Sequence, residues 1–169
     1  LALLGHANAA LGLVEQAGRR EFPLPTKVFV PFGTGSTAAG LALGFRIAGL
    51  STRVVAVRVV PFLVGRATRA FKLARRTQKL IERISDVRIP RLTPQDLSMN
   101  NDFYGGRYGR PLRKPSDHEK SLSLTGIRLD DTYSRKAFAA AAALAASDHA
   151  EGGDERVMFW MTFDSRLLG

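Results

Sequence analysis

A loop rich in glycine and hydroxyl residues separates a β-like run from a helix-like run within VFVPFGTGSTAAGLALGF, residues 28–45. Gly33 and Gly35 let the backbone bend so that its N–H groups point inward, and the N-terminus of a following helix adds a partial positive charge. Further hydrogen bonds can come from the hydroxyls of Thr34, Ser36 and Thr37. The stretch therefore predicts a seat for a phosphate monoester, with a tight glycine turn that holds no ligand as the alternative.

The residues around the glycines narrow the class of phosphate that the loop can hold. A P-loop requires a lysine and a hydroxyl residue after its last glycine, where Ala38 and Ala39 stand instead. The dinucleotide fingerprint G-x-G-x-x-G also fails, because the third glycine comes only at Gly40. The next predicted strand carries Arg58 rather than an acid that would hold a ribose, which leaves an NADP phosphate as an alternative. Neutral donors without a lysine favour one small phosphate, and pyridoxal phosphate is such a ligand.

Hydrophobic periodicity predicts the elements that must position this loop. Helices are expected over 1–19, 36–48, 64–84 and 133–147, and strands over 27–32, 52–60 and 156–163. The segment 90–117 is rich in Pro, Gly, Asn and Asp and is expected to be loop, preceded by a short strand near 87–89. This order predicts an α/β three-layer sandwich with a mostly parallel sheet. Gly40 and Gly44 lie four apart on one helical face, which predicts a close approach of that helix to the sheet.

Charge is the strongest feature of the composition. The chain has 169 residues, a formal net charge of +10 and a sequence pI near 10.8. Basic residues extend from Arg19 to Arg166, with a dense run over 66–83 on the outer faces of a predicted helix. This spread favours a solvated surface, and nucleic-acid binding is kept as a less favoured alternative. In that alternative Tyr104 and Tyr108, which stand among arginines, could stack on bases.

The composition also excludes several classes of site. No cysteine is present, so the chain has no disulfide, no thiolate zinc ligand and no cysteine nucleophile, which suits a cytoplasmic protein. No run of 18 apolar residues exists, so neither a transmembrane helix nor a membrane partner is expected. His6, His118 and His149 lack ligand spacing, so no metal site is expected. Asp130 and Asp131 precede a predicted helix, where we expect them to act on its N-terminus.

Three later motifs follow the glycine loop in an order typical of one enzyme family. They are GRYGRP at 106–111, TGIRLDDTYSRKA at 125–137 and FWMT at 159–162. Together with the loop they resemble the fold-type II, tryptophan synthase β-like pyridoxal-phosphate enzymes, and most of all the group of D-cysteine desulfhydrase and aminocyclopropane-carboxylate deaminase. The resemblance covers essentially the whole chain. It implies that 1–169 is the C-terminal, phosphate-loop part of the large domain of such an enzyme.

The resemblance implies pyridoxal 5′-phosphate as cofactor and gives roles to residues of this sequence. The cofactor would be held by Gly33, Thr34, Gly35, Ser36, Thr37 and Thr162. Thr162 would share a hydrogen bond with the pyridine nitrogen, and the catalytic residues would be Tyr133 and its neighbour Ser134, with Tyr133 as an acid, base or positioning group. Tyr104 and Tyr108 would then lie at the pocket rim or in a loop.

The same resemblance implies an activity and an assembly. Ser134 and Thr162 match the desulfhydrase branch rather than the deaminase branch. This implies α,β-elimination on a small amino acid such as D-cysteine, with deamination as the second choice. A homodimer is implied as well.

Other residues depart from the family pattern. Such enzymes bond a catalytic lysine to their cofactor, and neither that lysine motif nor the Ser-Asn-His stretch after it occurs in this chain. We therefore expect that the N-terminal half is absent and that the chain alone is inactive. Lys136 belongs to a Tyr-x-x-Lys-Ala motif, where a structural role is expected. Larger residues replace motif glycines at Arg107, Arg135, Phe163 and Asp164. These changes leave a non-catalytic protein with an interaction role as an alternative.

Overall fold

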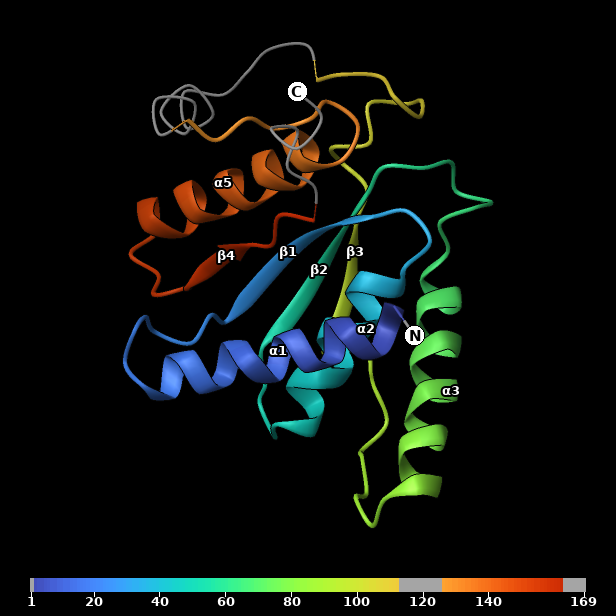
Figure 1. The fold of residues 1–169 in the computed structure, drawn as a ribbon. Coiled ribbons are helices and arrows are strands. Elements are labelled where there is room, and N and C mark those ends of the chain that lie inside the picture. Colours follow the sequence, from blue (N-terminus) through green and yellow to red (C-terminus); the bar gives the residue numbers. More distant parts are fainter. Residues whose placement is uncertain (1, 113–125, 163–169) are drawn as a thin grey trace.

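The computed structural model describes residues 2–112 and 126–162 (Figure 1). In chain order the elements are α1 (Ala2–Gly18), β1 (Lys27–Phe32), α2 (Ser36–Ile47), β2 (Arg53–Arg58), α3 (Ala67–Ile84), β3 (Leu97–Asn100), α5 (Ser134–Ala150) and β4 (Val157–Phe159). Of the residues singled out in the sequence, His118, Phe163, Asp164 and Arg166 lie outside the described residues. The alternation of helices and strands confirms the predicted α/β class.

The strands form one parallel sheet of order β3-β2-β1-β4. The two central strands are buried along almost their whole length, which explains why their sequences are apolar nearly throughout. In the β1–β2 register Phe32 pairs with Arg58, so the carboxyl ends of both strands lie at the same edge. Loops that follow parallel strands meet at that edge, where ligands bind in folds of this kind.

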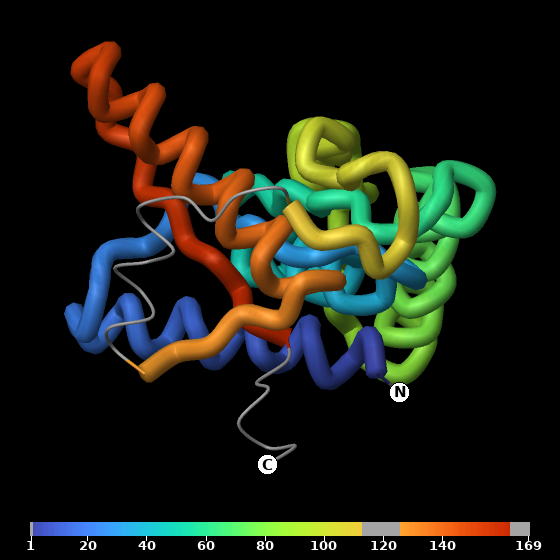
Figure 2. The backbone as a smooth tube through the Cα atoms, turned by 90° about the horizontal axis from the view of Figure 1, so that it is seen from above, coloured from blue at the N-terminus to red at the C-terminus, as the bar shows by residue number. Residues whose placement is uncertain are grey.

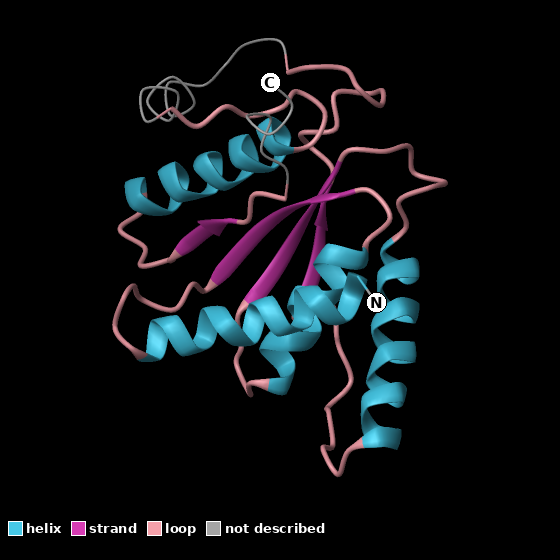
Figure 3. Cartoon of the chain, in the orientation of Figure 1, coloured by secondary structure: helices cyan, strands magenta, loops and turns pink. Residues whose placement is uncertain are grey.

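Helices cover both faces of the sheet, as the predicted three-layer sandwich requires. On one face, apolar side chains of α1, α2 and α3 form a core with Val28, Val30 and Val54 of the central strands. On the other face, Phe29 and Val55 pack against alanines of α5. Figure 3 shows the sheet between these layers, and Figure 2 shows α5 and α1 on opposite sides of it.

Gly40 and Gly44 bring two helices together, so the prediction that they face the sheet was wrong. A Cβ atom at Gly40 would lie 2.6 Å from the carbonyl oxygen of Leu3 in α1. A Cβ atom at Gly44 would lie 2.4 Å from the carbonyl oxygen of Ala7. Only glycine fits at both positions, because carbonyl groups of the neighbouring backbone occupy the space that a methyl group would need. The glycine face therefore fixes where α1 crosses α2.

The predicted loop over 90–117 contains β3, and the short strand expected near 87–89 does not form. The sequence of β3, Leu-Ser-Met-Asn, contains no apolar run that would predict a strand. Pairing with β2, which sets Val54 beside Leu97, makes it a strand. Around Ile89 the backbone finds side-chain partners instead, because its N–H donates to Glu82 and its carbonyl accepts from Gln78. β4 is also shorter than the expected strand over 156–163.

α3 is the most strongly amphipathic helix. Ala70, Ala74 and Gln78 are buried at a spacing of four, whereas Lys72 and Arg76 are exposed. This confirms the prediction that the basic side chains of this helix lie on its solvent-facing side. Within the described residues, no helix combines the length and the hydropathy that crossing a bilayer would take.

Candidate active site

The predicted glycine loop joins the end of β1 to the start of α2. Gly35, the residue before α2, has φ 89° and ψ 0°, a left-handed conformation that suits glycine. A Cβ atom there would lie 3.0 Å from two atoms of the Phe32 ring, so a side chain would be crowded as well as strained. Gly35 also offers no side chain to cap the helix. The first N–H groups of α2 are therefore left for an outside acceptor, as an anion seat requires.

A cavity of about 370 Å³ opens beside this loop, and we call it the loop cavity. It gathers seven of the eight predicted site residues, namely Gly33, Thr34, Gly35, Ser36, Thr37, Tyr133 and Thr162. The other lining residues are Pro31, Val60, Val64 and Tyr108. No acidic residue of the described chain is in the lining, so no carboxylate of the wall repels an anion.

The hydroxyl groups of the loop make two contacts, one within the loop and one with α1. Thr34 Oγ1 lies 3.2 Å from Ser36 Oγ, and either hydroxyl can donate to the other. Thr37 Oγ1 lies 3.1 Å from Nε2 of His6 in α1. If Nε2 carries the proton, it donates to Thr37, and the Thr37 hydroxyl is then free to donate into the cavity. Partial burial lowers the pKa of His6, so its ring is held toward the neutral form.

His6 is a site neighbour that the sequence did not reveal. Its sequence context suggests no role beside a phosphate loop, since 31 residues separate it from Thr37. The signal that could have found it is the glycine pair in α2, because close helix contact at Gly40 places the His6 Cβ atom 2.6 Å from where a Gly40 Cβ would stand. The close crossing of α1 and α2 thus brings an imidazole to the glycine loop.

Two tyrosines face each other at the cavity. The hydroxyls of Tyr108 and Tyr133 are 2.7 Å apart, and their rings meet edge to face with centroids 6.2 Å apart. The hydrogen bond with Tyr108, together with partial burial, raises the pKa of Tyr133 to about 12. Tyr133 therefore keeps its proton near neutral pH and can donate it or position a ligand. Tyr108 thus lines the loop cavity, which agrees with its expected place at the pocket rim or in a loop.

Asp130 fixes the backbone that carries Tyr133. Its carboxylate accepts hydrogen bonds from the N–H groups of Thr132, Tyr133 and Ser134 and from the Ser134 hydroxyl. Burial acts to raise the pKa of Asp130, but these hydrogen bonds outweigh it and the net shift is downward. The expected action of Asp130 at a helix N-terminus is therefore confirmed. Ser134 is fully buried and does not line the loop cavity, so the structure sets it behind Tyr133 rather than beside a ligand.

Lys136 holds the segment that carries Tyr108. Its side chain is buried, and its Nζ donates to the backbone carbonyl of Tyr104 over 2.9 Å. Desolvation is the main influence on Lys136 and lowers its pKa, against the opposing effects of Asp130 and Asp131. Because Lys136 does not line the loop cavity, its placement agrees with the structural role expected for it.

Arg58 is a buried cation at the end of β2, close to the loop. It is 5% exposed, and its neutral partners are Asn101 Oδ1 at 2.7 Å and the carbonyl oxygen of Gly65 at 2.6 Å. Its guanidinium also lies 4.9 Å from the centroid of the Phe62 ring. No carboxylate of the described residues forms an ion pair with it. These contacts fix the turn from which Val60 and Val64 reach the cavity.

Comparison with known proteins places this site in a family. The model of the pyridoxal-phosphate dependent enzymes matches residues 1–162. The chain belongs to this family. The nocardicin C-9′ epimerase of Nocardia uniformis subsp. tsuyamanensis is 31% identical over 178 residues, which cover 98% of this chain and 47% of the epimerase. A crystal structure of an ACC deaminase homologue has a TM-score of 0.67 and 24% identity, over 93% of this chain and 44% of that one. The chain thus spans less than half the length of either relative.

Family membership confirms the predicted family and its cofactor, pyridoxal phosphate, and the loop cavity has the chemistry to hold the phosphate end. The donors are the free N–H groups of the first turn of α2 and the hydroxyls of Thr34, Ser36 and Thr37. Thr162, the residue predicted to meet the pyridine nitrogen, lies in the same cavity. Within the described part of the chain, no cluster of His, Asp and Glu is placed to hold a metal ion.

Proposed function

We propose that this chain supplies the phosphate-binding part of a pyridoxal-phosphate dependent lyase or deaminase that acts on a small amino acid. The first candidate is α,β-elimination of the D-cysteine desulfhydrase type, and the second is deamination of an aminocyclopropane-carboxylate type. The observation that supports the proposal is the gathering of seven predicted site residues in one cavity of a family member. The resemblance of Ser134 and Thr162 to the desulfhydrase branch ranks the two candidates.

In this proposal the residues of the chain bind, orient and hold protons. The bound cofactor would supply an electron sink for the carbanion chemistry. Ser36 and Thr37 would grip its phosphate from the N-terminus of α2, and the neutral Thr162 hydroxyl would meet the ring nitrogen without protonating it fully. Tyr133, kept protonated by its hydrogen bond with Tyr108, would hold a proton at its phenolic oxygen beside the substrate.

The lysine of the reaction is proposed to lie in a part of the protein outside these residues. No lysine of the described chain lines the loop cavity. Lys136 is committed to the Tyr104 carbonyl, and Lys27 forms an ion pair with Glu155 at 2.5 Å. We therefore propose that the chain alone holds the cofactor but does not turn over.

A homodimer is proposed as the assembly. The turn after β2 presents Phe62 and Leu63 to solvent, 66% and 76% exposed, next to the cavity wall. An apolar turn of this kind is a place where a second copy could pack. Light scattering during size-exclusion chromatography measures the mass directly, and a monomer at all concentrations would contradict the dimer.

A second function, epimerisation, is favoured by one comparison. The relative with 31% identity is named as an epimerase. Epimerisation removes a proton from a carbon and returns one to the other face, whereas elimination from D-cysteine releases hydrogen sulfide and leaves an enamine that water hydrolyses to pyruvate and ammonia. Full-length protein incubated with D-cysteine therefore separates the two, because sulfide release reports elimination and L-cysteine without sulfide reports epimerisation.

The test of the cofactor seat uses pyridoxine 5′-phosphate. This compound has no aldehyde and cannot react with lysines, so its binding reports the grip on phosphate and ring alone. We expect the double change Thr34→Val with Ser36→Ala to weaken binding by about tenfold, equivalent to about 1.4 kcal/mol. Thr68→Val, at an exposed position of α3 outside the cavity, is the matched control. Equal affinity of both variants for pyridoxine 5′-phosphate would contradict the proposal. Salt-sensitive RNA binding by a chain that does not bind pyridoxine 5′-phosphate would favour the nucleic-acid alternative.

A further inference from the structure

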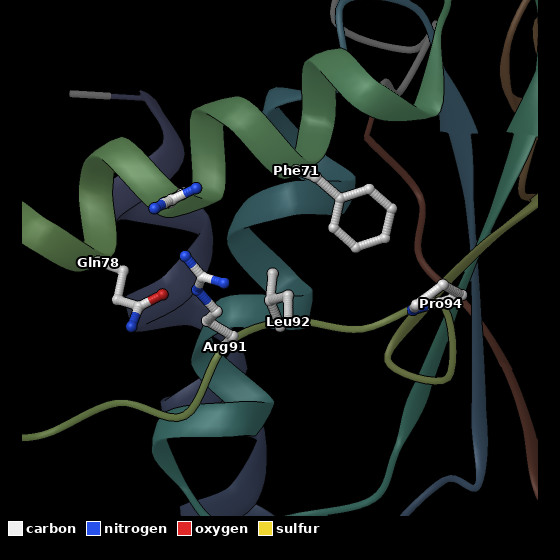
Figure 4. Close-up of a pocket in the computed structure, with 6 residues that line it drawn as sticks. Phe71, Gln78, Arg91, Leu92 and Pro94 are labelled. Atoms are coloured by element: carbon white, nitrogen blue, oxygen red, sulfur yellow. The ribbon is translucent and has the colours of Figure 1, made fainter.

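A second hollow, which we call the α3 hollow, lies away from the loop cavity and shares no lining residue with it. Its volume is about 320 Å³. Three lining residues, Phe71, Arg75 and Gln78, come from one stripe of α3, and the other three, Arg91, Leu92 and Pro94, come from the segment that leads to β3. Figure 4 shows α3 and this segment as the two walls.

Hydrogen bonds hold the two walls of the α3 hollow together. The Gln78 amide nitrogen donates to the carbonyl of Ile89 at 2.6 Å and to Glu82 at 3.2 Å. Glu82 in turn accepts from the Ile89 N–H at 3.0 Å. Gln78 is 9% exposed, so its side chain is fixed as well as bonded. These bonds therefore fix the position of the β3-leading segment against α3, so the two walls of the hollow are a formed feature of the fold.

Three polar groups around the hollow have unused hydrogen-bonding capacity. Within the described residues, the guanidinium groups of Arg75 and Arg91 form neither an ion pair nor a hydrogen bond. Arg46 of α2 differs from these two arginines, because it forms an ion pair with the carboxylate of Asp96 at 3.5 Å. The amide oxygen of Gln78 accepts no hydrogen bond from residues 2–112 and 126–162, and Figure 4 shows it on the side of Arg91. Two cations and one acceptor thus border a space whose other walls are apolar.

We propose that the α3 hollow binds a small organic anion, a phosphate or carboxylate on a flat apolar body that carries an N–H donor. The two guanidinium forks match the oxygens of such an anion. Phe71, Leu92 and Pro94 offer apolar contact to the body, and the Gln78 oxygen accepts from its N–H group. The volume suits one ligand of mononucleotide size, at the lower end of the range of about 300–1,000 Å³ for small-molecule sites.

Adenosine monophosphate is the probe, because it combines a phosphate, a flat base and an amino donor. Its dissociation constant is measured by isothermal titration at 0.15 M salt, beside inorganic phosphate and adenosine alone. We expect adenosine monophosphate to bind more tightly than either part. Arg75→Gln and Arg91→Gln should each weaken its binding by about tenfold.

Two matched variants control for general electrostatic attraction to a chain of net charge +10. Arg76→Gln and Arg88→Gln remove the same charge from neighbouring exposed positions that do not line the hollow. They should weaken binding by less than twofold. Equal losses in all four variants, or no saturable binding by the unaltered protein, would overturn the proposal. Because adenosine monophosphate could also enter the loop cavity, the Thr34→Val, Ser36→Ala variant is included and should retain full affinity.

Discussion

The loop cavity and the α3 hollow are both suited to an anion, but they use opposite means. At the loop cavity the donors are backbone N–H groups and neutral hydroxyls, fixed by a glycine turn and a helix start. At the α3 hollow they are two exposed guanidinium groups on long side chains. Fixed neutral donors lose little entropy on binding and discriminate by geometry, whereas flexible cations attract anions over a distance and discriminate less. The difference teaches that the high positive charge of the chain and its candidate cofactor seat are separate properties.

The largest expected effect comes from the helix crossing beneath the loop cavity. Gly44→Ala should lower the free energy of unfolding by about 3 kcal/mol, because the new methyl group would meet the Ala7 carbonyl at 2.4 Å. Denaturant titration followed by circular dichroism measures this. Gly12→Ala, a helical position of α1 with no atom within 4 Å of the added Cβ, is the control and should stabilise the protein by about 0.5–1 kcal/mol. A neutral Gly44→Ala change would mean that α1 does not cross α2 at this distance.

The next effect distinguishes the two anion sites directly. Gly35→Ala should weaken pyridoxine 5′-phosphate by tenfold or more and lower stability by about 1–3 kcal/mol, because φ 89° strains alanine and the Phe32 ring crowds it. Binding of adenosine monophosphate at the α3 hollow should be unchanged. Gly49→Ala is a useful control, since φ there is 73° but the added Cβ meets no atom within 4 Å. If Gly49→Ala weakened pyridoxine 5′-phosphate equally, general strain rather than the loop geometry would be responsible.

Salt should separate the sites by about tenfold. Between 0.05 and 0.5 M sodium chloride, affinity for adenosine monophosphate at the exposed arginines of the α3 hollow should fall by about tenfold, because a Debye length of about 10 Å at 0.1 M screens such charges. Affinity for pyridoxine 5′-phosphate at the loop cavity should fall by less than threefold. Equal salt dependence at the two sites would show that charge contributes as much to binding at the loop cavity as at the α3 hollow.

A smaller effect, about fivefold, is expected at His6. His6→Leu removes the partner 3.1 Å from Thr37 and should weaken pyridoxine 5′-phosphate, since a typical hydrogen bond contributes about 1 kcal/mol. His6→Gln retains an N–H donor and should restore most of the loss. Nitrogen-15 chemical shifts of the imidazole add a direct reading, because the bound state should carry the proton on Nε2. A proton found on the other nitrogen when the site is saturated would show that His6 accepts from Thr37 instead.

The smallest expected change is in the pKa of the Tyr133 hydroxyl, which lines the loop cavity. Tyr108→Phe should return the pKa of Tyr133 from about 12 toward its ordinary value of 10.0, because the hydrogen bond that raises it is lost. Absorbance at alkaline pH measures the ionisation. With Tyr108 present, the raised pKa in the folded state adds stability that is complete below pH 10 and is lost as pH rises toward 12. An unchanged pKa of Tyr133 in this variant would show that the hydrogen bond with Tyr108 does not cause the shift.

The fold and most of the candidate site could be predicted because their signals are local. β1 over Lys27–Phe32 and the start of α2 at Ser36 follow from an apolar run and from the glycines after it. β3 could not be predicted, because Leu-Ser-Met-Asn becomes a strand only through its pairing with β2. The sequence shows that Gly40 and Gly44 share one face of α2, but it does not show which element packs there. Close approach to a sheet and close approach to a helix both require glycine at these positions.

The contacts that complete the site depend on tertiary distance. Tyr108 meets Tyr133 across 25 residues and Thr37 meets His6 across 31, and no periodicity encodes either pair. The family resemblance predicts Tyr133 as a site residue but gives no role to His6. Ser134 shows that neighbours in sequence can face different ways, because its hydroxyl donates to Asp130 and it is buried away from the cavity that Tyr133 lines.

Arg58 qualifies the contrast between the two sites. Its guanidinium is satisfied by an amide oxygen and a carbonyl oxygen, neither of which cancels a charge. Its β1 neighbour in the sheet register, Phe32, is the residue immediately before Gly33. The guanidinium brings a buried positive charge to this edge of the sheet, behind donors that are themselves neutral. A phosphate at the glycine corner would therefore be attracted by a cation on the neighbouring strand, although the groups that bond to it are uncharged.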